Sequence, residues 1–318
     1  MSIQNEILKV LESERGKYFS GQELAATLNV SRQAVWKGIK TLQSDGHEII
    51  AKTNAGYALG ENSDVVTPSD IAARLNFDLE IITYKTIGST NLEAKSLLSQ
   101  GKKNNFLIIS DEQTNGLGRF GKSFFSPKNS VYMSLALNLE SEIVNPHAIT
   151  CATAVALVDS IVALTSEKPQ IKWVNDILLN GKKICGILTE GVLDFESARF
   201  KNVVIGIGIN CNQNLNDFPQ DIQNKVASLQ LNVPRNTLIA SVINNIYDNI
   251  FKNSSTVMSR YRDNSMIIGK NIIFQPDSDA VRAKVVDLNE NGHLIAQKDD
   301  GSQFIISSGA IDIEGLYK

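Results

Sequence analysis

The first 66 residues carry a pattern that few folds accommodate, three short helices followed by a hairpin. An apolar stripe at helical spacing marks the first helix. Ser20-Gly-Gln-Glu23 forms a capping box, which predicts a second helix from residue 21, and Ser31 can cap a third. Residues 48–51 and 56–59 have the composition of two strands around a tight turn.

Two helices separated by a short turn and followed by a β-hairpin make the winged form of the helix-turn-helix. The second of these helices carries polar and basic side chains opposite its apolar stripe, and the hairpin tip adds another cation. A solvated helix pair used for protein contacts is the alternative, but the agreement of caps, turn and hairpin favours DNA binding. The candidate DNA-binding residues are Ser31, Arg32, Gln33, Lys37, Lys40 and Lys52.

The balance of positive and negative residues limits the electrostatic affinity of this domain for DNA. The chain has 31 Lys and Arg residues against 34 Asp and Glu, a net charge of −3, so it is not basic throughout. Residues 1–66 are themselves charge-balanced. Affinity would therefore come from one focused face, and non-specific binding should be weak.

Composition predicts an ordinary globular protein of the cytoplasm. Hydrophobic residues make up 42% and charged residues 20%, which disfavours disordered and fibrous classes. Cys151, Cys185 and Cys211 are not at metal-ligand spacing, so we expect free thiols in a reducing compartment. The N-terminus lacks the pattern of a signal peptide, and we expect no apolar run to approach the roughly 20 residues of a membrane span.

Two further pattern changes predict an α+β multidomain chain. Thr67-Pro68-Ser69-Asp70 is a capping box with proline at the first helical position, and it starts a new domain of mixed strands and helices. From residue 266 the chain consists of short strands separated by turn clusters, which suggests a small SH3-like β-barrel. The expected domains are 1–66, 67–265 and 266–318.

Residues 116–122 match G-x-G-x-x-G, but their context excludes two common interpretations. A dinucleotide fold needs a helix to open within the motif, whereas here Pro127 follows with no helical stripe. A protein kinase would also carry H-R-D and D-F-G, and neither occurs. What remains is a loop with exposed amides and two cations, Arg119 and Lys122, suited to an anion.

Three later segments add the groups that a nucleotide with Mg²⁺ would need. Lys172-Trp-Val-Asn-Asp176 and Lys183 supply ammonium groups, an amide and a carboxylate, and Gly206–Asn210 ends a strand with a polar tip. Each segment alone is explained as well by a solvated surface turn. Together they favour an anionic substrate such as a nucleotide.

The order of these motifs resembles a known family over essentially the whole chain. The winged helix is followed by Ser89-Thr90-Asn91, Gln113–Arg119, Lys172–Asp176, Lys183–Glu190 and Gly206–Asn210, and then by the small β-domain. This combination is similar to the bifunctional biotin–protein ligases that also repress biotin operons. The resemblance implies a central mixed sheet with helices, as in class II synthetases.

The family implies a two-step reaction and a second role on DNA. ATP and biotin would form biotinyl-5′-AMP, and a lysine on the biotin carboxyl carrier domain of acetyl-CoA or pyruvate carboxylase would then take the biotinyl group. A ligand-bound homodimer would bind double-stranded operator DNA. ATP, Mg²⁺ and biotin are thus expected as substrates and metal, with no tightly bound prosthetic group and no membrane partner.

The resemblance also assigns roles by position. Arg119 and Lys183 would be catalytic, and Asp176 and Asn175 would hold Mg²⁺. Biotin would contact Ser89, Thr90, Asn91, Gln113, Gly116, Gly118, Arg119, Lys183 and Gly186. ATP or the adenylate would contact Arg119, Lys122, Phe124, Lys172, Asn175, Asp176 and Asn210.

The chain departs from the family pattern at three positions. Leu117 stands where arginine is frequent, and Val174 where proline is usual. Phe124 is the expected substitute for a tryptophan that often packs against adenine. Thr90 with Glu93 also has the form of a capping box, which gives Thr90 a structural alternative.

Two other functions remain as alternatives. One is a biotin-sensing transcription factor without ligase activity; the retained Arg119, Lys172, Asp176 and Lys183 favour an enzyme. The other is a lipoate or octanoate ligase, which shares the central fold. The winged domain, the glycine-rich loop and the terminal β-domain argue against that alternative.

Overall fold

The computed structural model of the chain describes residues 3–61, 63–139, 145–194, 199–251, 254–275 and 280–316. It divides into two compact units. Unit 1 comprises Met1–Arg74 and Val233–Ala240, and unit 2 comprises Leu75–Asn232 and Ser241–Lys318.

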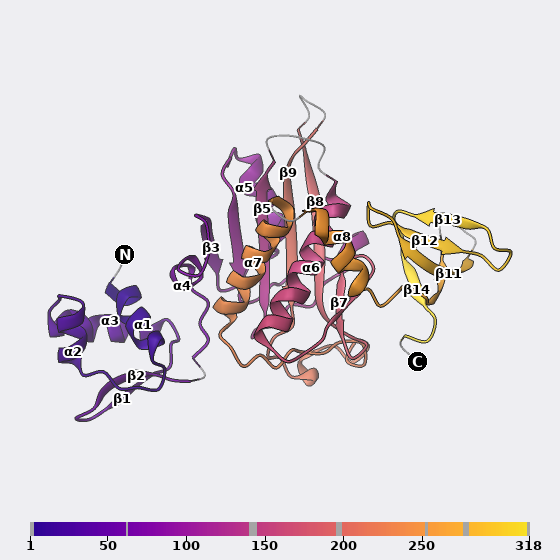
Figure 1. Cartoon of the computed structure of the whole chain (residues 1–318). Helices are drawn as coiled ribbons and strands as arrows, with labels where there is room; N and C mark the ends of the chain where they lie inside the picture. The colour runs from indigo at the N-terminus through magenta and orange to yellow at the C-terminus, as the bar shows by residue number, and fades with distance from the viewer. Residues whose placement is uncertain are drawn as a thin grey trace. The chain divides into compact units, whose positions relative to one another are not determined.

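Unit 1 contains the winged helix-turn-helix, as predicted (Figure 1). Ser20 accepts a hydrogen bond from the backbone of Glu23, whose carboxylate accepts one from the Ser20 amide at 2.7 Å, so the capping box is complete. The helices pack around a small apolar core that includes Leu11, Leu24 and Ile39. Its elements are α1 (Ile3–Ser13), α2 (Gly21–Thr27), α3 (Arg32–Ser44), β1 (Ile49–Lys52), β2 (Gly56–Leu59) and α4 (Pro68–Ala72).

Residues 64–67, just before α4, are hydrogen-bonded to the first residues of α7 (Arg235–Phe251). Arg235 donates to the Asp64 carboxylate from its backbone amide at 2.7 Å and from Nε at 2.8 Å. The side-chain oxygen of Asn236 accepts from the amide of Thr67 at 3.1 Å. Thr67 caps α4, and Pro68 occupies its first turn, as the sequence predicts.

Unit 2 is built on a seven-stranded mixed sheet in the order β3-β4-β5-β9-β8-β7-β6. Strands β3 and β4 pair in parallel, and all the other neighbours are antiparallel. The sequence did not predict the two short strands β6 and β7, which form a hairpin at the edge of the sheet. The strands are β3 (Glu80–Tyr84), β4 (Phe106–Ser110), β5 (Val131–Asn138), β6 (Gln170–Lys172), β7 (Asp176–Leu179), β8 (Lys182–Asp194) and β9 (Arg199–Ile209).

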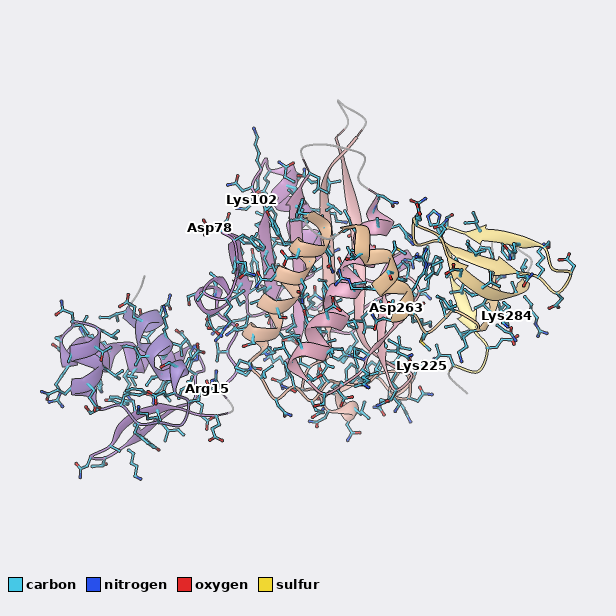
Figure 2. All side chains as sticks on the ribbon, viewed as in Figure 1. Arg15, Asp78, Lys102, Lys225, Asp263 and Lys284 are labelled. Atoms are coloured by element: carbon cyan, nitrogen blue, oxygen red, sulfur yellow. The ribbon has the colours of Figure 1, made fainter. Side chains whose placement is uncertain are left out.

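Helices cover the two faces of this sheet. On one face α5 (Thr90–Ser99) packs against a core that includes Phe106 and Val204. On the other face lies α6 (Pro146–Leu164), where Thr150 bonds Thr189 of β8 at 2.8 Å. Helices α7 and α8 (Ser254–Asp263) lie on the α6 side, as Figure 1 shows. Helix α8, whose last residue Asp263 is labelled in Figure 2, was not predicted.

Helix α6 corrects one expectation from the sequence. Its 19 residues have a mean hydropathy of 1.8 over the best window, enough by length and composition to cross a membrane. However, 67% of that window is buried inside the protein. The apolar character of α6 is therefore explained by its burial in unit 2, where it packs against the strands β6, β7 and β8 and against α8.

The C-terminal part of unit 2 is a five-stranded antiparallel sheet in the order β13-β12-β11-β10-β14. Its core includes Ile272, Val285 and Leu294, which alternate with outward-facing residues along their strands. All five strands were predicted, so the α+β class with a small terminal β-domain is confirmed. They are β10 (Asn271–Phe274), β11 (Val281–Leu288), β12 (Leu294–Gln297), β13 (Gln303–Ile306) and β14 (Ile311–Ile313).

Candidate functional site

A pocket lies on the α5 face of the large sheet, where the helix, the glycine-rich loop and the strands β8 and β9 meet. It brings together residues that are far apart in the sequence. Those of its lining residues that were predicted as site residues are Ser89, Thr90, Asn91, Gln113, Gly118, Arg119, Phe124, Asn175, Lys183 and Gly186.

One wall of the pocket is a chain of polar groups that begins at the N-terminus of α5. The Gln113 side-chain oxygen accepts hydrogen bonds from the Thr90 amide at 2.9 Å and from its hydroxyl at 3.1 Å. The Gln113 amide group donates in turn to Ser126 at 3.0 Å. Thr90 is thus held by Gln113 and is the first helical residue rather than the cap, which corrects the capping-box alternative. The N-cap residue is Ser89, and its hydroxyl makes no capping bond.

Asn91 is fixed against the sheet by a close approach that only glycine permits. Its amide group donates to Glu190 at 2.9 Å, and its oxygen lies 2.6 Å from the hydroxyl of Ser134. A Cβ atom on Gly206 of β9 would lie 2.1 Å from the Asn91 oxygen. The strand glycine therefore makes room for the Asn91 side chain.

The glycine-rich loop is a small hairpin, so part of its backbone amides are hydrogen-bonded within it and are not exposed as expected. The amide of Gly118 donates to the Lys122 carbonyl at 2.7 Å, and that of Phe124 donates to the Gly116 carbonyl at 2.8 Å. Those backbone donors are consumed within the loop. Anion binding here would depend on side-chain cations, chiefly Arg119.

Arg119 reaches from this loop to the segment 172–176. Its Nη1 atom donates to the Asn175 side-chain oxygen at 3.1 Å, while the Asn175 amide group donates to the Ile187 carbonyl at 2.9 Å. Partial burial lowers the pKa of Arg119 from its usual value, and nearby Asp176 opposes that shift. The guanidinium remains charged at any physiological pH.

A second charged group lies beside the first. Lys183 Nζ lies 2.7 Å from Asp176 Oδ1, with both side chains about three-quarters buried. Burial lowers the pKa of Lys172, Asp176 opposes the shift, and Lys183, Asp312 of β14 and Lys122 also act on it. Positive charge therefore exceeds negative charge here, as an anionic substrate requires.

Phe124 lies over the glycines of the sheet. A Cβ atom on Gly208 would lie 2.4 Å from the ring of Phe124, and one on Gly186 would lie 3.0 Å from it. Lys183 Nζ is 5.4 Å from the centre of the same ring. The ring thus rests on a floor of bare backbone next to a cation, which is suited to a flat ligand.

The other predicted site residues do not line this pocket. Gly116 lines a neighbouring cavity of about 380 Å³, on the side of Phe125 and Ile222. Lys122, Lys172 and Asp176 belong to the charged group described above. Asn210 is buried, and its amide group donates to the carbonyls of Ala227 at 3.0 Å and Lys183 at 3.4 Å.

Asn210 thus helps to fix the backbone of Lys183 through the Lys183 carbonyl. The amide of Lys183 donates to the carbonyl of Lys225, labelled in Figure 2, at 2.8 Å, and the amide of Ala227 donates back to the carbonyl of Lys183 at 2.9 Å. The Lys183 ammonium group therefore projects from a backbone that is fixed on both sides.

Magnesium has few protein ligands available at this site. Within the described residues, no group of three or more His, Cys, Asp or Glu side chains is placed to hold a metal ion. Asn175 and Asp176 offer one amide oxygen and one carboxylate, both already facing cations. That donor set fits an ion held mainly by substrate phosphates, the usual mode for Mg²⁺ at nucleotide sites.

A separate candidate site lies in unit 1, between α3 and the β-hairpin. A groove of about 870 Å³ is lined by Arg32, Gln33 and Trp36 together with residues 51–57, which include Lys52. Sequence analysis missed Trp36, although it falls outside the apolar stripe of its helix and 51% of its surface is exposed. The exposed Trp36 side chain forms part of the lining of this groove, next to Arg32 and Gln33.

The remaining predicted DNA-binding residues have other places on α3. The Ser31 hydroxyl caps the helix by accepting from the Ala34 amide at 3.1 Å. Lys37 and Lys40 are exposed but do not line the groove, and Lys40 donates to Gln43 at 3.2 Å.

Comparison with known proteins agrees with this arrangement. Residues 83–210 match the biotin/lipoate A/B protein ligase family, residues 3–58 match an HTH domain, and residues 267–313 match the biotin protein ligase C-terminal domain. The fold resembles that of a biotin protein ligase from Aquifex aeolicus in complex with biotin and ATP, with a TM-score of 0.61 and 22% identity over 74% of this chain and 98% of that one.

Two relatives are similar to this chain over most of its length. The bifunctional ligase/repressor BirA of Escherichia coli is 28% identical over 233 residues, covering 72% of this chain and 71% of its own. BirA of Bacillus subtilis is 30% identical over 325 residues, covering 98% of both chains. With that identity over nearly the full length of both proteins, the chain belongs to the BirA family of bifunctional ligase/repressors.

Proposed function

We propose that the protein joins biotin to a carrier domain in two steps at the unit 2 pocket, and represses transcription through unit 1. The observation that carries the ligase proposal is the pair of cations, Arg119 and Lys183, fixed by Asn175 and Asp176 beside a glycine-floored pocket. A carboxylate and a triphosphate repel each other, and two preorganised cations remove that repulsion.

In the first step the polar wall would hold the ring end of biotin. The Ser89 hydroxyl makes no capping hydrogen bond, and Thr90, Asn91 and Gln113 present fixed donors and acceptors. Gly118 and Gly186 leave room for the ligand, and Gly116 sets the neighbouring turn of the loop.

The carboxylate end of biotin would lie toward Arg119 and Lys183. One of its oxygens forms a bond to the α-phosphorus of ATP as the bond to pyrophosphate breaks, which gives biotinyl-5′-AMP. Lys172 and Lys122 would balance the charge of the departing pyrophosphate, and Phe124 would face the adenine or the biotin rings. Asn210 would act through the backbone of Lys183.

Mg²⁺ would enter on the phosphates of ATP, where it neutralises charge on the leaving group. Asp176 and Asn175 are the residues proposed to hold it. Their present partners, Lys183 and Arg119, would exchange these oxygens for oxygens of the substrate.

In the second step the ε-amine of a carrier lysine would attack the acyl carbon of the adenylate. An amide bond forms, AMP leaves with the bonding electrons, and the amine loses a proton. The hairpin that carries Arg119 would keep water from the mixed anhydride until the carrier docks.

The DNA role is proposed for the groove of unit 1. Arg32, Gln33 and Trp36 would enter the major groove of the operator, and Lys52, Lys37 and Lys40 would contact phosphates. Ser31 would act as the cap that orients the helix. We further propose that the ligand-bound protein dimerises on DNA in the cytoplasm, with functional domains at 1–66, 67–265 and 266–318.

The direct test supplies the purified chain with ATP, Mg²⁺, biotin and a biotin carboxyl carrier domain, and measures the mass of the carrier. Addition of one biotinyl group supports the proposal. Lipoate and octanoate with their own carrier are the matched controls. Biotin-dependent binding to DNA without any transfer to the carrier would identify a sensor instead and overturn the ligase proposal.

A further inference from the structure

The segment 173–175 is held by two hydrogen bonds from outside the pocket. The hydroxyl of Tyr261, in α8, donates to the carbonyl of Val174 at 3.1 Å. The indole nitrogen of Trp173 donates to the carbonyl of Gly292 at 2.9 Å. The segment that carries Asn175 and Asp176 is thus bonded both to a helix and to the terminal β-domain.

The Gly292 carbonyl is held against α6, where Gly292 lies close to two residues of that helix, His147 and Cys151. Gly292 lies in the turn between β11 and β12 with a φ of +77°, and a Cβ atom there would lie 2.7 Å from the sulfur of Cys151. His147 Nε2 lies 2.9 Å from the same carbonyl oxygen. The ring of His293 contacts the His147 ring edge-on, with a centroid distance of 5.0 Å.

The Tyr261 hydroxyl and the His147 ring both keep the proton that they donate in these hydrogen bonds. Tyr261 is fully buried, and burial raises its pKa well above the usual value, so its hydroxyl keeps the proton. Burial also lowers the pKa of His147, while the bond to Gly292 opposes that shift. A neutral His147 with its proton on Nε2 is therefore a second donor to the Gly292 carbonyl.

We propose that Tyr261, Trp173 and His147, acting through the carbonyls of Val174 and Gly292, are positioning residues for the ATP-dependent step. The inference rests on the proposed ligase function. Val174 directly precedes Asn175, which holds Arg119, so a small displacement of residues 173–175 moves the partners of both site cations. The polar wall that would hold biotin is bonded elsewhere, through Thr90, Gln113 and Ser126.

This division predicts a specific kinetic signature. Loss of either bond should lower kcat/KM for ATP much more than the affinity for biotin, because the polar wall that would hold the ring end of biotin is bonded elsewhere. A residue with a merely structural role would lower the fraction of active protein and alter both substrates alike. The experiment therefore measures biotin binding by calorimetry and adenylate formation by pyrophosphate release, on the full chain.

Tyr261→Phe is the sharpest variant because it removes one hydroxyl and little else. We expect kcat/KM for ATP to fall about tenfold, with biotin affinity within twofold of the original. Tyr84→Phe is the matched control, since the Tyr84 hydroxyl also makes one side-chain bond, to Glu93 at 2.9 Å, and its strand β3 lies at the opposite edge of the sheet from β6 and β7.

The terminal β-domain side is tested by Trp173→Phe and by two changes at His147. His147→Leu removes the ring donor and should lower kcat/KM for ATP severalfold, whereas His147→Gln keeps a donor at a similar reach and should restore most of it. Equal effects of Leu and Gln would show that the hydrogen bond is not what matters.

Two outcomes separate this inference from the function on which it rests. A wild-type protein that forms no biotinyl-5′-AMP overturns the proposed function together with the inference. A wild-type protein that forms it, with Tyr261→Phe and Trp173→Phe unchanged in kcat/KM for ATP, overturns the inference alone. Parallel losses in biotin binding and ATP use would also overturn it.

Discussion

The guanidinium of Arg119 donates a hydrogen bond to the side-chain oxygen of Asn175 at 3.1 Å and so joins two segments 56 residues apart in sequence. The arginine of the glycine-rich hairpin is therefore docked against the segment 172–176 before any substrate arrives. A ligand anion has to compete for this guanidinium, but it finds the cation already placed.

Arg119→Ala should impair retention of the adenylate far more than it impairs folding. One charge-assisted hydrogen bond to the ligand is worth about 1.5–3 kcal/mol, so release of biotinyl-5′-AMP should accelerate roughly 10- to 100-fold. The residue adds little to the apolar core, so the Tm should hardly change. Release is measured by chasing labelled adenylate, and unfolding by calorimetry. Equal losses of stability and retention would contradict the assignment.

Lys183→Gln should slow adenylate formation because it removes one of the two cations at the reacting carboxylate. We expect a loss of about 10²- to 10³-fold in the rate of the first step, the scale for removal of an electrostatic stabiliser. The neighbouring Lys182→Gln is the matched control. Rapid-quench measurement of labelled biotinyl-5′-AMP gives the rate. Similar rates for the two variants would exclude Lys183 from catalysis.

Gly206→Ala should abolish biotin binding through Asn91. The new Cβ atom would lie 2.1 Å from the Asn91 oxygen, so the side chain must leave its place on the sheet. Gly88→Ala is the control, because a Cβ atom there meets no described atom within 4 Å. Adding Asn91→Ala to Gly206→Ala should restore the Tm but not the affinity for biotin, as calorimetry will show. Restored affinity would mean that Asn91 is dispensable.

Arg32→Ala with Lys37→Ala should abolish operator binding and leave ligation intact, because these residues belong to unit 1. Trp36→Ala should weaken binding to operator DNA while leaving the salt dependence unchanged, since an apolar contact releases no counterions. Fluorescence titrations would use DNA from upstream of the biotin genes and a scrambled duplex. Unchanged operator affinity would reject α3 as the recognition helix.

The raised pKa of Glu12 should make the stability of unit 1 depend on pH. Burial, aided by the charge of Asp70, raises its pKa from 4.5 to about 7 in spite of Arg15 and Arg74. Between those values the folded state holds a proton that the unfolded state has lost, so stability should fall as the pH rises from about 5 through 7. Glu12→Gln should flatten this slope, and Glu14→Gln should not.

Trp36 can report this transition. The chain has two tryptophans, so in a Trp173→Phe background the fluorescence comes from unit 1 alone. Thermal unfolding between pH 5 and 8 then gives the slope. Burial lowers the pKa of His47 in the same unit and contributes a slope of opposite sign, so the comparison with Glu12→Gln decides: an unchanged slope in that variant would refute the raised pKa of Glu12.

The elements with strong local signals were predictable from the sequence. The capping box at Ser20, the N-cap at Thr67 and the alternation in the last strands come from interactions between near neighbours, which the sequence displays directly. The short strands β6 and β7 and the helix α8 have weaker patterns, and tertiary packing defines them.

The candidate site shows the same limit. Motif order indicated which residues gather at the pocket, but not which atoms are already engaged. The amides of the glycine-rich loop were expected to be exposed, but those of Gly118 and Lys122 are hydrogen-bonded within it. The roles of Tyr261 and Gly292 depend on contacts across 87 and 119 residues, for which no local pattern exists.

The contact between Trp173 and Gly292 also has a consequence for protein synthesis. During translation N-terminal regions fold first, so the winged domain and much of the pocket can form before residue 292 leaves the ribosome. Until then, the segment 173–175 lacks one of its two anchors. The winged domain of a nascent chain would thus be folded before the segment that positions Asn175 is complete, and ATP-dependent activity would begin only after the β11–β12 turn has formed.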